Sequence, residues 1–238
     1  MKQIALYLFM NNKFMSITSN ICAIMKKRIF YLFTAIFIFS SCADDFDDLL
    51  KPPSDFYYVG SMTIPFYTNG NSGMPNIDWG NDIGTYSLNT TYAGVGVDAQ
   101  TSILSWNENL PIGSNDIQVT ATNSFGSAVT NVLFLHQFSG QFIGGYNTNP
   151  SSTTITASNL DITFNVNETM SITDDGTTVN GTWSFVADEL ICLYSIAAVD
   201  YELSFDLTYS VTVNPFLEGY KKVVGSASNS GFARLDYQ

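Results

Sequence analysis

Asp116-Ile117-Gln118-Val119-Thr120-Ala121-Thr122 is the stretch that decides the fold, because its apolar and polar residues alternate one by one. A period of two places every apolar side chain on one face, as in a β-strand with one buried side. A Ser-Phe-Gly-Ser turn at 124–127 follows, and then a second strand-like run over 128–135. The sequence therefore predicts a β-hairpin with one face in a core.

The same character extends over the rest of the chain beyond residue 56. Short stretches rich in Thr, Val, Ile, Tyr and Phe are separated by Gly, Asn and Asp, and no segment keeps a capped period of 3.6. After a boundary near 137–140 we expect strands at 141–146, 153–157, 160–166, 169–173, 177–186, 189–195, 201–213 (in one piece or two), 217–226 and 232–237. An antiparallel meander of this length closes into a small barrel or curls into a sandwich, so the predicted class is all-β.

Two dipeptides in this second half are typical of tight hairpin turns. Asp175-Gly176 and Asn180-Gly181 are the pairs that type I′ turns prefer, because both central residues then need a positive φ. Asp175-Gly176 falls between two expected strands, whereas Asn180-Gly181 is a turn signal inside the expected strand 177–186.

Charge is distributed very unevenly along the chain. Five of the nine Lys and Arg precede Cys42, whereas all 21 Asp and Glu follow it. The part after Cys42 therefore has four basic and 21 acidic residues, a formal net charge of −17. Such a surface repels phosphate backbones, so we expect no nucleic-acid partner.

The first 41 residues have the pattern of a targeting segment. Met25-Lys26-Lys27-Arg28 is followed by an almost wholly apolar run over 29–39 and then by Ser40-Ser41-Cys42. The apolar run would rise about 16 Å as a helix, too little for a hydrocarbon core of about 30 Å. The sequence predicts a cleaved signal peptide at 25–41, with residues 1–24 as an upstream extension.

Phe39-Ser40-Ser41-Cys42 resembles the relaxed lipobox of Bacteroidetes-type lipoproteins, with Phe39 in place of the usual Leu. The acidic run 43–48 resembles the stretch that sends such lipoproteins to the cell surface. The resemblance implies lipidation of Cys42 and a bacterial outer-membrane location, exposed at the cell surface. Carboxylates and Pro52-Pro53 indicate an extended tether over 42–55.

Residues 56–137 carry a second resemblance, in Ile103-Leu104-Ser105-Trp106, Leu110-Pro111, Gly113 and the hairpin around 117–128. These residues resemble the immunoglobulin-like and dystroglycan-type cadherin-like domains of bacterial surface proteins. The resemblance implies a β-sandwich in which Trp106 lies between the sheets. Cadherin-like domains often bind calcium, but the acidic residues of this part are scattered (Asp78, Asp82, Asp98, Glu108 and Asp116). We therefore expect no cofactor, with a specific calcium site as the weaker alternative.

Residues 138–238 resemble lipocalin-like barrel domains of bacterial lipoproteins, in Gly181-Thr182-Trp183 and in the Phe and Gly pattern of 138–146. The interior of such a barrel is either a ligand cup or filled with side chains, and a filled interior is the usual case for eight strands. We favour the filled interior.

The residues needed for catalysis do not come together in the sequence. The single histidine, His136, and the one cysteine of the second half, Cys192, both lie in apolar runs, and no Gly-x-Ser-x-Gly motif is present. Asp188 and Glu189 are adjacent, so they would point to opposite faces of a strand. We expect no catalytic residue, no metal site and no enzymatic activity.

Aromatic residues with amide neighbours are the feature of the sequence that indicates ligand binding. Trp79, Tyr86 and Tyr92 are the candidate ligand-binding residues, since aromatic faces beside amides suit sugar rings. The leading hypothesis is a membrane-anchored, non-enzymatic binding or adhesion module for a glycan or an envelope protein. The alternatives are a lipocalin-like carrier of a small apolar ligand and a structural spacer in an envelope complex.

Overall fold

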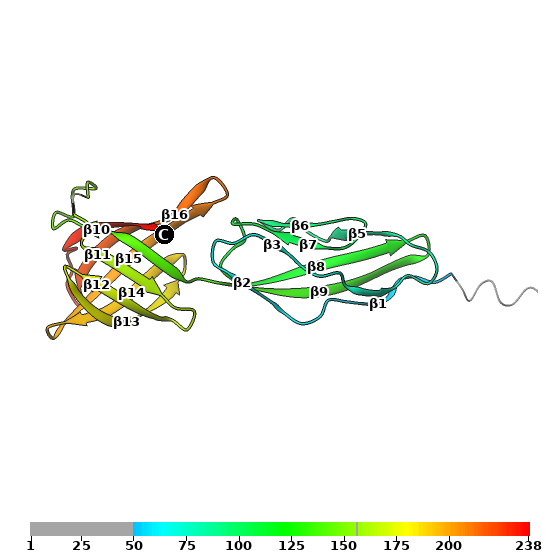
Figure 1. Ribbon diagram of the computed structural model, residues 1–238, viewed down its shortest axis with the longest axis horizontal. Helices are drawn as coiled ribbons and strands as arrows, with labels where there is room; N and C mark the ends of the chain where they lie inside the picture. The colour runs from blue at the N-terminus through cyan, green and yellow to red at the C-terminus, as the bar shows by residue number, and fades with distance from the viewer. Residues whose placement is uncertain (1–49, 156) are drawn as a thin grey trace, which may run out of the picture. The chain divides into compact units, whose positions relative to one another are not determined.

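The computed structural model describes residues 50–155 and 157–238. The predicted extension, the signal peptide and Cys42 lie outside these residues. Within them, no helix is long and apolar enough to cross a membrane. Pro52–Gln238 form one compact unit, built of strands throughout (Figure 1). The all-β prediction is confirmed.

The first half is a β-sandwich of the immunoglobulin-like kind. Its four-stranded sheet has the order β2-β9-β8-β5, and its three-stranded sheet has the order β3-β7-β6 (Figure 1). A separate ribbon pairs β1 with β4. The bounds are β1 Ser54–Tyr57, β2 Met62–Pro65, β3 Gly70–Asn71, β4 Asn76–Asp78, β5 Thr85–Leu88, β6 Val95–Val97, β7 Leu104–Trp106, β8 Gly113–Asn123 and β9 Gly126–Gln137.

The long hairpin of β8 and β9 is the centre of this sandwich, as the alternation of residues 116–122 predicts. Ile117, Val119 and Ala121 are fully buried, and the side chains between them face outward. Together with residues such as Leu104 and Phe134 they form one apolar core. The ring of Trp106 packs edge-on against Phe134, with centroids 5.5 Å apart, so Trp106 contributes to the core from its margin.

The second half is a closed, eight-stranded antiparallel barrel in which each strand pairs with the next and β10 pairs with β17. Because the sheet closes, the second half is a barrel and not a sandwich, the other architecture that the sequence allows. The bounds are β10 Gly140–Tyr146, β11 Leu160–Phe164, β12 Thr169–Asp174, β13 Thr177–Val186, β14 Glu189–Ile196, β15 Val199–Ser210, β16 Val213–Val223 and β17 Gly231–Tyr237.

One local prediction for this half is wrong, and one turn signal does not correspond to a turn. The segment 153–157 forms no strand in its described residues; the Asn147 side-chain amide instead binds the carbonyl oxygens of Ser152 and Thr154 in the loop after β10. Asn180-Gly181 is not a turn but lies inside β13, where Gly181 pairs with Tyr194. Asp175-Gly176 does form the β12–β13 turn, with φ of 48° and 82°.

The barrel interior is filled by large apolar side chains, as favoured from the sequence. Phe142, Ile162, Leu203 and Phe205 are among those with no exposed surface, and they belong to one continuous cluster. Phe66, which follows β2, belongs to the same cluster and packs against Phe138 with a centroid distance of 5.0 Å. Burial of such side chains stabilises the fold by about 1.5–3 kcal/mol each.

Candidate functional site

The three aromatic residues singled out from the sequence are used in packing. Tyr86 is 7% exposed, and Trp79 packs edge-on against it with centroids 5.1 Å apart. Burial raises the pKa of the Tyr86 hydroxyl. Tyr92 packs on the same core at another place, where its hydroxyl accepts a hydrogen bond from the backbone N–H of Gln118 at 3.1 Å. The structure thus joins Trp79 to Tyr86 and leaves little of the buried Tyr86 ring for a ligand.

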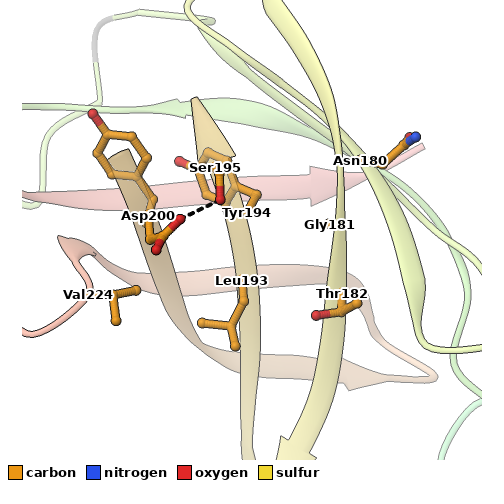
Figure 2. Close-up of a pocket in the computed structure, with 9 residues that line it drawn as sticks. Asn180, Gly181, Thr182, Leu193, Tyr194, Ser195, Asp200 and Val224 are labelled. Carbon is orange, nitrogen blue, oxygen red and sulfur yellow. Dashed lines mark hydrogen bonds between the residues drawn. The ribbon is translucent and has the colours of Figure 1, made fainter. Parts of the chain in front are cut away.

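A depression of about 370 Å³ on the outer wall of the barrel offers a better-formed site (Figure 2). It lies across β13, β14 and the start of β15, where outward-facing side chains alternate with inward-facing ones such as Trp183 and Cys192. Its lining residues are Asn180, Gly181, Thr182, Leu193, Tyr194, Ser195, Asp200, Tyr201 and Val224.

The centre of this barrel-wall depression is apolar and its rim is polar. Leu193 lies between Thr182 and Val224 in Figure 2, and 44% of Leu193 is exposed. On the rim, the Ser195 hydroxyl donates to the Asp200 carboxylate at 2.5 Å. The backbone N–H of Val224 donates to the Asp200 carbonyl oxygen at 2.9 Å, which fixes Val224 beside the rim.

The lining of the depression combines one charged residue with apolar, hydroxyl and amide groups. Asp200 is the one formally charged residue in its lining, and the neighbouring carboxylate of Glu202 is paired with Lys222 at 2.8 Å. An apolar patch surrounded by hydroxyl, amide and carboxylate groups suits a sugar ring, which presents C–H groups on its faces and hydroxyl groups at its edge. Sequence reasoning missed this site because its residues come from three strands and from Val224 after β16, and none of them is aromatic and outward-facing.

A second candidate surface is the outer face of the four-stranded sheet of the sandwich. Amide side chains form a hydrogen-bonded row there: Asn89 donates to Gln118, and Gln118 donates to Asn131 at 3.1 Å. Exposed Val129 and Leu133 flank Asn131 on β9. This face carries hydrogen-bonding groups, whereas the barrel wall also offers a depression.

A third feature is a layer of polar side chains inside the barrel. Asp174 at the end of β12 contacts Lys221 of β16 at 2.5 Å and accepts a hydrogen bond from the Tyr194 hydroxyl at 2.6 Å. The rings of Tyr146 and Tyr201 lie 4.0 and 4.6 Å from the Lys221 ammonium. The layer lies at the end of the barrel where β10 and β12 end, and no sequence pattern indicates it, because Asp174 stands next to a predicted turn.

The two residues considered for nucleophilic chemistry are buried at separate places. Cys192 has no exposed surface, and burial raises the pKa of its thiol. His136 is 2% exposed; its Nδ1–H donates to the Leu110 carbonyl oxygen at 2.8 Å, and burial lowers the pKa of the imidazole. Among residues 50–155 and 157–238, no group of three His, Cys, Asp or Glu side chains is arranged to hold a metal ion.

The chain is thus a two-module all-β protein, with an immunoglobulin-like sandwich followed by an antiparallel barrel. No family model matches it, and no curated protein matches it. Among solved structures, it is similar to the crystal structure of human protocadherin-24 EC1-2, at 11% identity and a TM-score of 0.36. That alignment covers 78% of this chain and 93% of the protocadherin chain.

Proposed function

We propose that this protein is a lipid-anchored, non-enzymatic module of the bacterial cell surface that binds a glycan in the barrel-wall depression. The observation that carries the proposal is the depression itself, an apolar centre at Leu193 with hydroxyl, amide and carboxylate groups around it. The acidic body favours neutral over anionic glycans, because its charge repels acidic sugars.

Glycan-array screening of the soluble fragment 43–238 tests the proposal. We expect binding to neutral oligosaccharides, and we expect Leu193→Glu to weaken it at least tenfold, since the carboxylate replaces the apolar centre. Val129→Glu is the matched control, because it changes an equally exposed aliphatic residue on the sandwich. Arrays without a neutral-glycan hit, or equal binding by the Leu193→Glu variant, would contradict the proposal.

A protein partner in the envelope is the second candidate, and the amide row on the sandwich favours it. Asn89, Gln118 and Asn131 hold one another in place, so this face presents ordered donors and acceptors at little entropic cost. In that case Val129→Glu, rather than Leu193→Glu, would abolish capture of the partner from envelope extracts. A carrier role for the barrel gains no support from an interior filled by residues such as Phe142 and Phe205.

The anchor part of the proposal rests on Cys42 and the lipobox-like residues before it. Metabolic labelling with a fatty acid should mark the wild-type chain and leave Cys42→Ala unlabelled, because the thiol is the acylation site. Protease treatment of intact cells should remove the wild-type chain if it is displayed outside. Labelling of the Cys42→Ala variant would contradict the anchor.

A further inference from the structure

The contact between Lys221 and Asp174 spans the inside of the barrel. The two residues lie on β16 and β12, and three strands separate these on either side of the closed barrel. Their side chains are only 7% and 3% exposed, and the Lys221 Nζ lies 2.5 Å from the Asp174 Oδ2. Barrel closure therefore presses an amine against a carboxyl group away from solvent.

Tyrosine side chains surround this pair. Tyr146 and Tyr201 present their ring faces to the Lys221 nitrogen, and the Tyr194 hydroxyl donates to the same Oδ2 that Lys221 contacts. The other oxygen, Asp174 Oδ1, is buried and has no hydrogen-bond partner within the described part of the chain. The tyrosine side chains thus enclose Lys221 and Asp174, and one oxygen of the Asp174 carboxyl group lacks a hydrogen bond.

A charged pair is costly in such a place. Burial of an ammonium and a carboxylate carries a large desolvation cost, which a neutral bond between the two side chains would remove. Holding two reacting groups in contact corresponds to an effective concentration of up to about 10⁵–10⁸ M. Geometry and environment thus favour acyl transfer from Asp174 to Lys221.

We propose that Lys221 and Asp174 are joined by an intramolecular amide bond between Nζ and Cγ, formed as the barrel closes. The Lys221 nitrogen bonds to Cγ, the C–Oδ2 bond breaks, and Oδ2 leaves as water with the two protons that the nitrogen gives up. Tyr194 gives a proton to the departing Oδ2 and regains one from the attacking nitrogen, so one water is lost and no oxidant or activating group is consumed. The cross-link fastens opposite walls of the barrel and goes beyond the proposed binding function.

Peptide mapping of the full chain tests this directly. A glutamate-specific protease cleaves after Glu168, Glu189 and Glu218, so the wild-type digest should contain peptide 169–189 joined to peptide 219–238, lighter than the sum of the two by one water. Recovery of the two peptides separately at their full masses, without the joined pair, would overturn the proposal. This readout uses the wild-type chain, so it does not depend on whether a variant folds.

Three variants separate the cross-link from simple ion pairing. Lys221→Arg keeps the positive charge but should lose the joined pair completely, whereas Lys222→Gln, which changes the neighbouring, partly exposed lysine, should keep it. Tyr194→Phe should accumulate unlinked chain after synthesis, because the proton donor at Oδ2 is gone. A joined pair in Lys221→Arg, or its loss in Lys222→Gln, would assign the mass change to another residue and refute the assignment.

Discussion

At the scale of single residues, the burial of Cys192 determines its reactivity. The side chain has no exposed surface, and burial raises the pKa of its thiol, so the thiolate is scarce even in mildly alkaline solution. In the fragment 43–238, where Cys192 is the only cysteine, we expect no reaction with a thiol reagent at pH 8.5 in the native state and complete reaction in denaturant. Rapid native-state labelling would show that the barrel opens at β14.

His136 gives the fold a dependence on pH with a definite sign. Burial lowers the pKa of the folded imidazole below the value of about 6.5 in the unfolded chain, so the unfolded state takes up protons first as the pH falls. The stabilisation is complete above pH 6.5 and declines below it, by up to about 1.4 kcal/mol per pH unit. Urea unfolding between pH 7.5 and 5.5 should show a smaller decline in His136→Gln; an equal decline would assign the effect to other groups.

The burial of a residue can be predicted from the sequence where its neighbours in the chain determine its environment. Cys192 lies in an apolar run and is buried, as predicted. Such a prediction fails for Asp174, whose Asp175-Gly176 context indicates an exposed turn, because the contact with Lys221 joins positions 47 residues apart. That pairing exists only once the barrel has closed.

At the scale of the strands, two glycines of the β12–β13 hairpin should respond differently to substitution. Gly176 has a φ of 82° and open space around it, so Gly176→Ala should cost about 1 kcal/mol in backbone strain. Gly181 lies within β13, where an added Cβ would stand 2.5 Å from the Leu193 carbonyl oxygen, so Gly181→Ala should cost about 1–3 kcal/mol. Urea unfolding midpoints measure both; an equal or larger loss for Gly176→Ala would contradict this ranking.

The same hairpin shows why local signals give strands more reliably than turns. Asn180-Gly181 has turn chemistry, yet β13 continues through it, because Gly181 fits the crowded interior under Met170 where a larger residue would not. The segment 153–157 has the composition of a strand, but Asn147 holds the loop around it by side-chain hydrogen bonds. In both cases tertiary contacts decide against the local preference.

At the scale of the whole molecule, the sequence predicted two β modules but left open whether the second closes. Closure depends on the pairing of β10 with β17, in which Phe142 lies opposite Tyr237. No local sequence pattern predicts this pairing. The barrel-wall depression has the same origin, since Thr182, Leu193 and Val224 come together only when neighbouring strands are in register. Non-local pairing therefore sets both the architecture and the candidate site.

The negative charge of the chain after Cys42 determines how its melting temperature should respond to salt and to calcium. The formal charge of −17 after Cys42 destabilises the compact state by self-repulsion, which salt screens within a Debye length of about 10 Å at 0.1 M. The melting temperature of fragment 43–238 should therefore rise with NaCl, and CaCl₂ at matched ionic strength should add no saturable increase.

The sandwich carboxylates explain why calcium should add nothing specific. Asp78 and Asp82 accept hydrogen bonds from the backbone N–H groups of Gly80 and Ser124, and Asp98 accepts from two N–H groups of its own turn. These backbone bonds lower the pKa of Asp98 and engage Asp78 and Asp98 in local turns and Asp82 with the turn between β8 and β9, whereas a calcium site needs six to eight converging oxygens. A saturable rise in melting temperature with CaCl₂, absent with MgCl₂ at the same ionic strength, would instead establish a specific calcium site.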